Sequence, residues 1–477
     1  MDEEEDFLGD YEQQRIVANQ FKQALAEGRT PYFEAFQFEG VADYFLTEGE
    51  EKLAKKALVC GLRFHPNSLE LQLKLVSVEL YYGGLERTLN LIETLEKIAP
   101  NNMELLSLKG LAYMQLNRVE EAIELHQRTD GYEEDLTYDI AHYFHRIGEF
   151  EEAIRYWEKL YQKNKNWIHL RQIAVCYSEL GDYENGNVYF LKSLEERPLE
   201  VSSWLDLGEN YYYLNEPLKA IEALDNAIAL ENTSTRAHFY KGKSLVKLKQ
   251  HLEATVVFEE YLEMNPDDDK AHFLLADCYL ATSQFEKACQ HYQRVVELNP
   301  ENNDARHNIA VAMHFDGRNE SALQMMQQLL QLKDNDAYYW ETLGLIYTAL
   351  GRMTEAKEAF EKSISIDARC GQSWVSLSDF ALQSDGREAA LAVLERGFEQ
   401  WHFDYRVLAR KIVLLVELNR SEEAMKTLKF ALDLLFDGQE EFREKLRLSM
   451  EELEPTNEII SQIISLIETT PISKLDF

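Results

Sequence analysis

Residues that could carry chemistry lie in one stripe of a predicted helix. Asp135, Asp139, His142 and Arg146 recur every three or four residues, which places them on one helix face. Asp139 and His142 could bind a metal ion or form a carboxylate–histidine pair. The alternative, which we favour, is a solvated polar surface with His145 beside it. A metal-dependent enzyme using this stripe is the least favoured of the functions considered.

Other catalytic and cofactor-binding patterns are missing. His307 and His314 are two helical turns apart, too far for one metal ion. Gly83-Gly84 lacks the Lys-Ser/Thr of a phosphate-binding loop, and there is no Gly-x-Ser-x-Gly, Cys-x-x-Cys or His-x-x-x-His. We therefore predict no enzyme, no catalytic residue, no cofactor and no metal site.

The charge of the chain limits its partners. Its 85 acidic residues against 49 basic ones give a formal net charge of -36. Such a surface disfavours nucleic-acid phosphates and anionic membranes as ligands. The charge has two explanations that both stay open: it keeps an extended chain soluble, or it attracts a basic partner.

Cysteine usage and the N-terminus indicate a compartment. The chain has five cysteines, an odd number that cannot all pair with one another, and all five fall in predicted helices. We expect reduced thiols in a reducing environment. The acidic start of the chain is unlike a secretory signal, and no apolar run approaches the roughly 18 residues of a membrane span. The expected location is cytoplasmic.

The elements that carry these residues follow a period of about 34 residues, for which residues 269–302 are the reference. Each repeat predicts two amphipathic helices joined by a short turn. Small residues occupy the eighth place of most repeats and the twentieth place of nearly all, which would let the two helices approach closely. The predicted repeats begin near residues 35, 69, 103, 134, 167, 201, 235, 269, 303, 337, 371 and 405.

Large residues fill complementary places. Trp204, Trp340 and Trp374 occupy the fourth place, aromatic residues the eleventh and twenty-fourth, and Pro266 and Pro300 end second helices. This combination of Trp, Leu, Gly, Tyr, Ala, Phe and Pro resembles the tetratricopeptide repeat family.

The resemblance implies an all-α fold, a right-handed α-solenoid superhelix of about twelve helix-turn-helix units with capping helices. The expected organisation is an acidic N-terminal tail at 1–10, a capping helix at 11–34, the array at 35–438, and C-terminal capping helices at 439–477. The third repeat is short, so irregular structure is expected at residues 127–136. The last repeat is less typical, with Lys411 and Ile412 at core places.

The resemblance also implies a binding groove. In the family, the first helix of each repeat faces the concave surface through places 2, 5, 6, 9, 12 and 13, and the Asp139 stripe would share that face. Aromatic rings interleaved with charges suit a peptide ligand. The predicted groove residues are Asp206, Glu209, Tyr212, Tyr213, Phe239, Tyr240, Lys243, Lys247, Phe273 and Asp277.

Two functions of different kinds follow. The first is a non-enzymatic scaffold or adaptor that binds an extended peptide or a helix in the groove. Its partner is a protein or peptide, and that partner is basic if the acidic surface serves to attract it. The second is a regulatory subunit whose folded partner docks on the outer surface or on a terminus. Phe239 and Tyr240 could instead pack against neighbouring repeats.

Overall fold

A computed structural model of the chain describes residues 2–129, 134–402, 404–433, 440–453 and 458–469, without the side chains of residues 2–12 and of several positions in the last two helices. The described residues are helical throughout and contain no β-strand, so the predicted all-α class is confirmed. The chain divides into two compact bodies, Met1–Ala237 and His238–Phe477, which we describe separately. Among the described helices, none is both long enough and apolar enough to cross a membrane.

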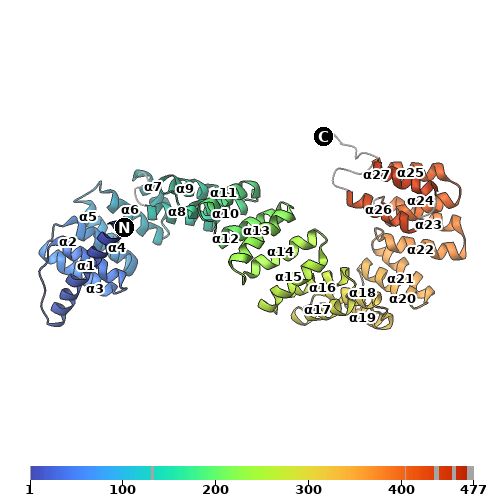
Figure 1. The fold of residues 1–477 in the computed structure, drawn as a ribbon, viewed down its shortest axis with the longest axis horizontal. Coiled ribbons are helices and arrows are strands. Elements are labelled where there is room, and N and C mark those ends of the chain that lie inside the picture. Colours follow the sequence, from blue (N-terminus) through green and yellow to red (C-terminus); the bar gives the residue numbers. More distant parts are fainter. Residues whose placement is uncertain (1, 130–133, 403, 434–439, 454–457, 470–477) are drawn as a thin grey trace. The chain divides into compact units, whose positions relative to one another are not determined.

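The N-terminal body holds the first half of the helix pairs (Figure 1). After α1, each pair consists of an even-numbered first helix and an odd-numbered second helix. The helices are α1 (Asp2–Ala26), α2 (Ala35–Thr47), α3 (Glu51–Phe64), α4 (Leu69–Tyr82), α5 (Leu85–Glu96), α6 (Met103–Gln115), α7 (Val119–Arg128), α8 (Glu134–Ile147), α9 (Phe150–Lys163), α10 (Trp167–Glu179), α11 (Tyr183–Glu196), α12 (Val201–Tyr213) and α13 (Pro217–Leu230).

The C-terminal body continues the same pattern, and the boundary between the bodies falls inside α14. Its helices are α14 (Thr235–Lys247), α15 (His251–Met264), α16 (Asp269–Ala281), α17 (Phe285–Leu298), α18 (Asn303–Phe315), α19 (Asn319–Leu332), α20 (Ala337–Ala349), α21 (Met353–Ile366), α22 (Gly371–Ser384), α23 (Arg387–Gln400), α24 (Tyr405–Glu417), α25 (Ser421–Asp433), α26 (Glu440–Leu453) and α27 (Glu458–Thr469).

The first helices α2 to α24 begin at the residues where the 34-residue period starts each repeat. Consecutive helices pack as antiparallel pairs, as the fold prediction required. The N-terminal end differs, because α1 begins at Asp2, inside the segment expected to be a tail. The handedness of a superhelix and the division into tail, array and caps stay predictions.

Close packing within each pair rests on small residues that face large ones. A Cβ atom placed on Gly344 of α20 would lie 2.6 Å from the ring of Phe360 in α21. Gly242 of α14 has the same relation to the ring of Phe258 in α15, at 2.7 Å. In these pairs, therefore, the close approach of the two helices requires a residue without a side chain at the eighth place. The alanines at the twentieth place are all fully buried: Ala54, Ala122, Ala153, Ala220, Ala254, Ala288, Ala322, Ala356, Ala390 and Ala424.

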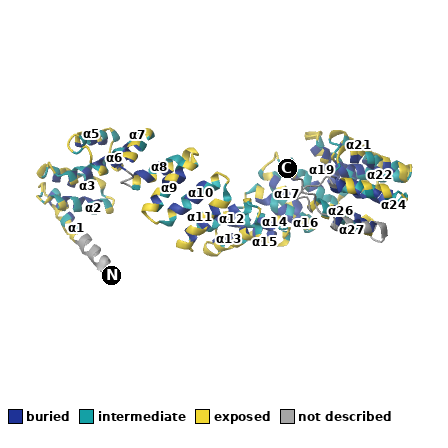
Figure 2. Ribbon diagram, turned by 90° about the horizontal axis from the view of Figure 1, so that it is seen from above, coloured by how far each residue is buried: buried dark blue, intermediate teal, exposed yellow. Residues whose placement is uncertain are grey.

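The turn between the two helices of a pair is equally regular. In ten of the twelve repeats its fifteenth place adopts the left-handed conformation, even where the residue is not glycine, as at Lys249 (φ 59°) and Ser283 (φ 59°). The exceptions are Gly83 (φ -117°) and Asp385 (φ -122°). This conformation ends the first helix and reverses the chain. In Figure 2 buried and exposed residues alternate along the helices, so each helix turns one face to its neighbours. The left-handed residues at this place are Gly49, Asn117, Gly148, Gly181, Asn215, Lys249, Ser283, Gly317, Gly351 and Asn419.

In five repeats the side chain at the fourth place ties the first helix to the turn before it. Whether Trp, His or Gln stands there, its side-chain N–H donates to the backbone carbonyl six residues upstream, which explains why such different residues share the place. The bonds are Gln72 to Pro66 (2.7 Å), Trp204 to Pro198 (2.8 Å), His272 to Pro266 (3.1 Å), Trp340 to Asp334 (2.7 Å) and Trp374 to Ala368 (2.8 Å).

The third repeat is shortened at its second helix. Helix α7 has 10 residues, whereas α9 in the next pair has 14. The predicted irregularity at 127–136 includes residues 130–133, which lie outside the described residues.

The last pair is well formed despite its atypical core places. Ile412 is fully buried, and Lys411 keeps its Nζ 4.6 Å from the centre of the Phe398 ring. Helices α26 and α27 pack on this pair with Ile463 and Ile467 buried, as a terminal covering should. The side chain of Ile459 in α27 lies outside the described residues.

Replacing Gly344 by Ala should lower the free energy of unfolding by about 1–3 kcal/mol, because the new methyl group would press on the buried Phe360 ring. Gly84→Ala is the control, since Gly84 has open space around its Cα and an ordinary φ of -107°. Urea denaturation followed by circular dichroism measures both changes. Equal midpoints for the two variants would refute the packing argument.

Candidate functional site

The predicted groove residues of α12 are joined to neighbouring first helices by ion pairs. Asp206 accepts from Arg171 of α10 at 2.6 Å and from Arg236, at the start of α14, at 3.3 Å. Glu209, which is buried, accepts from Arg236 at 2.8 Å. These carboxylates therefore hold three successive first helices together. The sequence predicts that Asp206 and Glu209 lie on this face. Which arginines bind them depends on the distances between repeats, which the sequence does not give.

Tyr212 and Tyr213 end α12 and offer more surface. The Tyr213 ring stacks on Tyr183 of α11, with centroids 5.3 Å apart and planes within 14°. Tyr212 meets Tyr213 edge-on at 5.5 Å. Half of Tyr213 remains exposed, so a fixed aromatic surface faces the solvent here.

The next four predicted residues share α14, in the C-terminal body. Phe239 contacts Phe258 and Tyr261 of α15, with ring centroids 6.3 and 5.4 Å away. Lys243 lies over the rings of Tyr240 (4.9 Å) and Phe239 (5.5 Å). Phe239 thus packs within its own helix pair, whereas the alternative considered from the sequence was packing against neighbouring repeats. Lys247 is exposed at the end of the helix.

Phe273 and Asp277 of α16 are brought together by a core tyrosine. The Tyr292 ring meets Phe273 edge-on at 5.4 Å, and its hydroxyl donates to Asp277. Burial raises the pKa of Asp277 above its ordinary value. Asn308 of α18 donates to the same tyrosine hydroxyl at 3.3 Å, so this cluster joins two repeats.

The Asp139 stripe lies beside a cavity of about 390 Å³ between α6 and α8. The His142 ring packs edge-on against Tyr138 (4.5 Å) and Trp157 (5.0 Å), and no hydrogen bond joins it to Asp139. Burial raises the pKa of Asp139 and lowers that of His142. The two groups therefore do not form the carboxylate–histidine pair that the least favoured hypothesis needs. Over the described ranges, no group of three or more metal-binding side chains is found.

His307 and His314, the other histidines considered as metal ligands, contact different residues. His307 of α18 contacts Thr342 of α20 at 2.8 Å through Nε2, whereas His314 contacts Asn319 at 2.7 Å through Nδ1. Each ring thus has its own hydrogen-bond partner, and these partners come from different helices.

The five cysteines are all buried and unlinked. Cys176 lies 3.7 Å from Nδ1 of His145, a contact that the sequence analysis did not predict. Burial raises the pKa of the Cys176 thiol to about 12, so it is protonated at neutral pH and lacks the thiolate of a catalytic cysteine.

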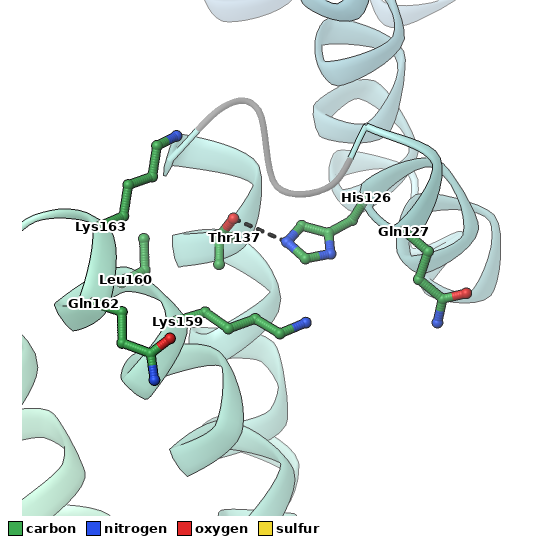
Figure 3. A pocket seen from close by; sticks show the side chains of 7 residues that line it. All are labelled: His126, Gln127, Thr137, Lys159, Leu160, Gln162 and Lys163. Atoms are coloured by element: carbon green, nitrogen blue, oxygen red, sulfur yellow. Dashed lines mark hydrogen bonds between the residues drawn. The ribbon is translucent and has the colours of Figure 1, made fainter.

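A cavity of about 510 Å³ opens where α7 is short (Figure 3). His126 of α7 points toward Thr137 of α8, and 2.9 Å separates Nε2 from Oγ1. Lys159 and Lys163 extend from α9. The short third repeat was the sequence signal for this place, although not for the side chains that line it.

The pair His272 and His291 was also missed. Their Nδ1 atoms are 2.9 Å apart, and Nε2 of His272 lies 3.1 Å from the Pro266 carbonyl oxygen. Because a carbonyl only accepts, His272 carries its proton on Nε2, and His291 donates from Nδ1.

Comparison with known proteins identifies two of the predicted repeats. The family model described as "Tetratricopeptide repeat" matches residues 269–302, and a second model of that description matches residues 337–370. The chain therefore contains tetratricopeptide repeats, as the resemblance predicted. Tetratricopeptide repeats are in general protein–protein interaction modules.

Superkiller protein 3 of Saccharomyces cerevisiae is similar over a short stretch, with 28% identity over 91 residues. That stretch covers 19% of this chain and 6% of the yeast protein. The chain thus matches a small fraction of that relative's length.

Solved structures similar to this chain include YrrB, described as a TPR protein with an unusual peptide-binding site. It is 22% identical, covering 39% of this chain and 95% of its own, with a TM-score of 0.35. Yeast Tom70 is 12% identical, covering 90% and 99%, with a TM-score of 0.41. The Cut9–Hcn1 structure of the APC/C is 12% identical, covering 95% and 98%, with a TM-score of 0.38.

The buried histidine pair should make stability depend on pH. Burial lowers the pKa of His291 from its ordinary 6.5 to about 4. Between these values the unfolded chain binds more protons than the folded chain, so the free energy of unfolding falls as the pH falls. The expected loss between pH 7 and about pH 5.5 is about 1 kcal/mol.

His291→Gln keeps a donor for His272 but does not titrate. Urea denaturation at both pH values should therefore show a smaller loss for this variant than for the wild type. An equal loss in both proteins would show that the histidine pair contributes nothing to the pH dependence.

Proposed function

We propose that the protein is a non-enzymatic interaction scaffold that binds an extended peptide or a helix of its partner. The binding surface is the first-helix face, defined by places 2, 5, 6, 9, 12 and 13 of the even-numbered helices α2 to α24. The observation that carries the proposal is a pair of exposed aromatic stacks at equivalent places in the two bodies.

One stack is Tyr183 with Tyr213, and the other is Phe285 with Phe315. In each, the thirteenth place of a first helix stacks on the opening residue of the preceding second helix. The rings of Phe285 and Phe315 are 6.0 Å apart with planes within 20°. Tyr213 is 50% and Phe315 is 61% exposed, which is high for rings held in place by stacking. Rigid exposed aromatic rings are typical anchors for a protein ligand, because little entropy is lost when they are covered.

The surroundings of the stacks support a peptide ligand. Tyr138 at a fifth place and Tyr338 at a second place of the same face are 40% and 57% exposed. Carboxylates and arginines lie among these rings and could orient a bound chain by hydrogen bonds.

Binding is tested with peptides selected against the full-length protein from a displayed random library. Tyr213→Ala should weaken the affinity of a selected peptide at least tenfold, measured by fluorescence anisotropy, because truncating an anchor removes about 2 kcal/mol. Its melting temperature should change little. Leu218→Ala is the control, since Leu218 is 70% exposed on second helix α13.

Equal losses in both variants, or a loss of fold in Tyr213→Ala, would contradict the proposal. The same comparison for Phe315→Ala shows whether the C-terminal body contributes to binding.

A second function, a regulatory subunit that docks a folded partner, is favoured by another groove in the C-terminal body. The groove has a volume of about 1230 Å³ and lies among α21, α22 and α23. Trp374, Phe380 and Val393 contribute apolar surface to it, and Lys357 and Arg396 contribute charge. A groove of this size could receive an element of a folded protein.

Ala389→Arg would fill this groove, because Ala389 lines it and is half-buried. If the partner uses the first-helix face, Ala389→Arg should bind a partner purified from the native host as the wild type does, and Tyr213→Ala should not. Surface plasmon resonance with that partner separates the two modes. The reverse pattern would establish docking on the second-helix side.

A further inference from the structure

Two aspartates occupy the same place on neighbouring parts of the first-helix face. Asp139 is the sixth residue of α8, and Asp206 is the sixth residue of α12. Asp206 is bound by two guanidinium groups, Arg171 at 2.6 Å from the preceding pair and Arg236 at 3.3 Å from the following one. Asp206 therefore shows what a carboxylate at this place of the array binds.

Asp139 lacks both of these arginines. The residue equivalent to Arg171 is Ser107, at the fifth place of α6, and the residue equivalent to Arg236 is Ile168, at the second place of α10. Across the ranges that the structure describes, no hydrogen bond or ion pair reaches Asp139. Its carboxylate is nevertheless half-buried.

The state of this carboxylate agrees with its isolation. Burial, together with the like charge of Asp135 one turn away, raises the pKa of Asp139 above its ordinary value. A cation that approached Asp139 would relieve both effects, since an opposite charge favours the ionised carboxylate.

The cavity beside Asp139 has the size of a side chain rather than of a whole ligand. Its volume is about 390 Å³, at the low end of the range for small-molecule sites. The tyrosine ring and the methionine thioether in its lining suit the flat face and the aliphatic stem of an arginine. The lining residues are Met114 and Gln115 from α6 and Asp139, His142, Tyr143 and Arg146 from α8.

One cation already belongs to this cavity. Arg146 lies two helical turns from Asp139, about 10 Å along the helix axis, and its guanidinium is held 5.8 Å from the Tyr143 ring. Asp135 and Asp139 carry two negative charges on the same stripe. The end of the stripe near Asp139 therefore keeps a net negative charge.

We propose that Asp139 binds an arginine side chain supplied by the partner, in the position that Arg171 and Arg236 occupy at Asp206. The inference rests on the proposed function, since the arginine would belong to the peptide on the first-helix face. Arginine is preferred over lysine because the planar guanidinium matches a carboxylate with two parallel hydrogen bonds.

The subsite can be tested without a partner. The probe is N-acetyl-L-arginine methylamide, compared with the citrulline analogue, which has the same shape without the charge. Saturation-transfer NMR on the full-length protein should detect the arginine probe at millimolar concentration and give at least a fivefold weaker signal for citrulline.

Two substitutions should remove the arginine signal. Asp139→Asn removes the charge with little change of shape. Ile168→Arg introduces the arginine found at the second place of α14 and should occupy Asp139 from within the chain. Asp135→Asn, an exposed carboxylate of the same stripe, is the control and should retain most of the signal. Circular dichroism checks that each variant is folded.

The proposal is overturned if Asp139→Asn responds to the arginine probe as the wild type does, or if citrulline binds as well as arginine. It is also overturned if the wild type gives no signal. None of these outcomes contradicts the proposed function if Tyr213→Ala still weakens the binding of a selected peptide. Conversely, arginine recognition at Asp139 can hold even if no displayed peptide depends on Tyr213.

Discussion

The structure depends on the distance between the two helices of each pair. That distance is set where a small residue of the first helix meets a large side chain of the second, as Gly344 meets Phe360 and Gly242 meets Phe258. The buried alanine at the twentieth place, early in the second helix, likewise keeps the surface of the second helix free of a bulky side chain where it faces the first helix. Because most pairs meet the same constraint, their first helices present equivalent places to their neighbours. Because of this regularity, the first-helix face extends over several repeats within each body.

Much of that face is used to hold repeats together. Arg171, Asp206, Arg236 and Glu209 form one network in the N-terminal body. In the C-terminal body, Glu341 is buried and accepts from the backbone N–H and the hydroxyl of Ser373 in the next pair, at 3.0 and 3.1 Å. Polar residues on a concave face are therefore not free for a ligand merely because they point toward it. The groups that remain for a partner are the exposed rings and a carboxylate such as Asp139, whose equivalent arginines are missing.

The fold could be predicted from the sequence because its signals are local. Small and aromatic places repeat along the chain, so the helix starts follow from the period. The left-handed turn could be expected at Gly181 or Asn215 but not at Lys249 or Ser283, where the residue type gives no sign of it. Site residues were harder, because pairing across repeats depends on geometry that no local pattern records. Phe239 and Asp277 looked like ligand-binding residues, but they contact Tyr261 and Tyr292 of their own pairs. The stack of Phe285 on Phe315 was missed because its residues come from different repeats.

Which face meets the partner is decided most directly by photo-crosslinking in the native host. A benzophenone amino acid placed at Tyr213 or Phe315 reports on the first-helix face, and one placed at Leu218 or Ala389 reports on the second-helix side. Mass spectrometry of the adducts identifies the partner and the contacted segment. Binding on the first-helix face predicts that Tyr213, Phe315 or both crosslink to the partner and that Leu218 and Ala389 do not. Crosslinks from Leu218 or Ala389, with none from Tyr213 or Phe315, would contradict it.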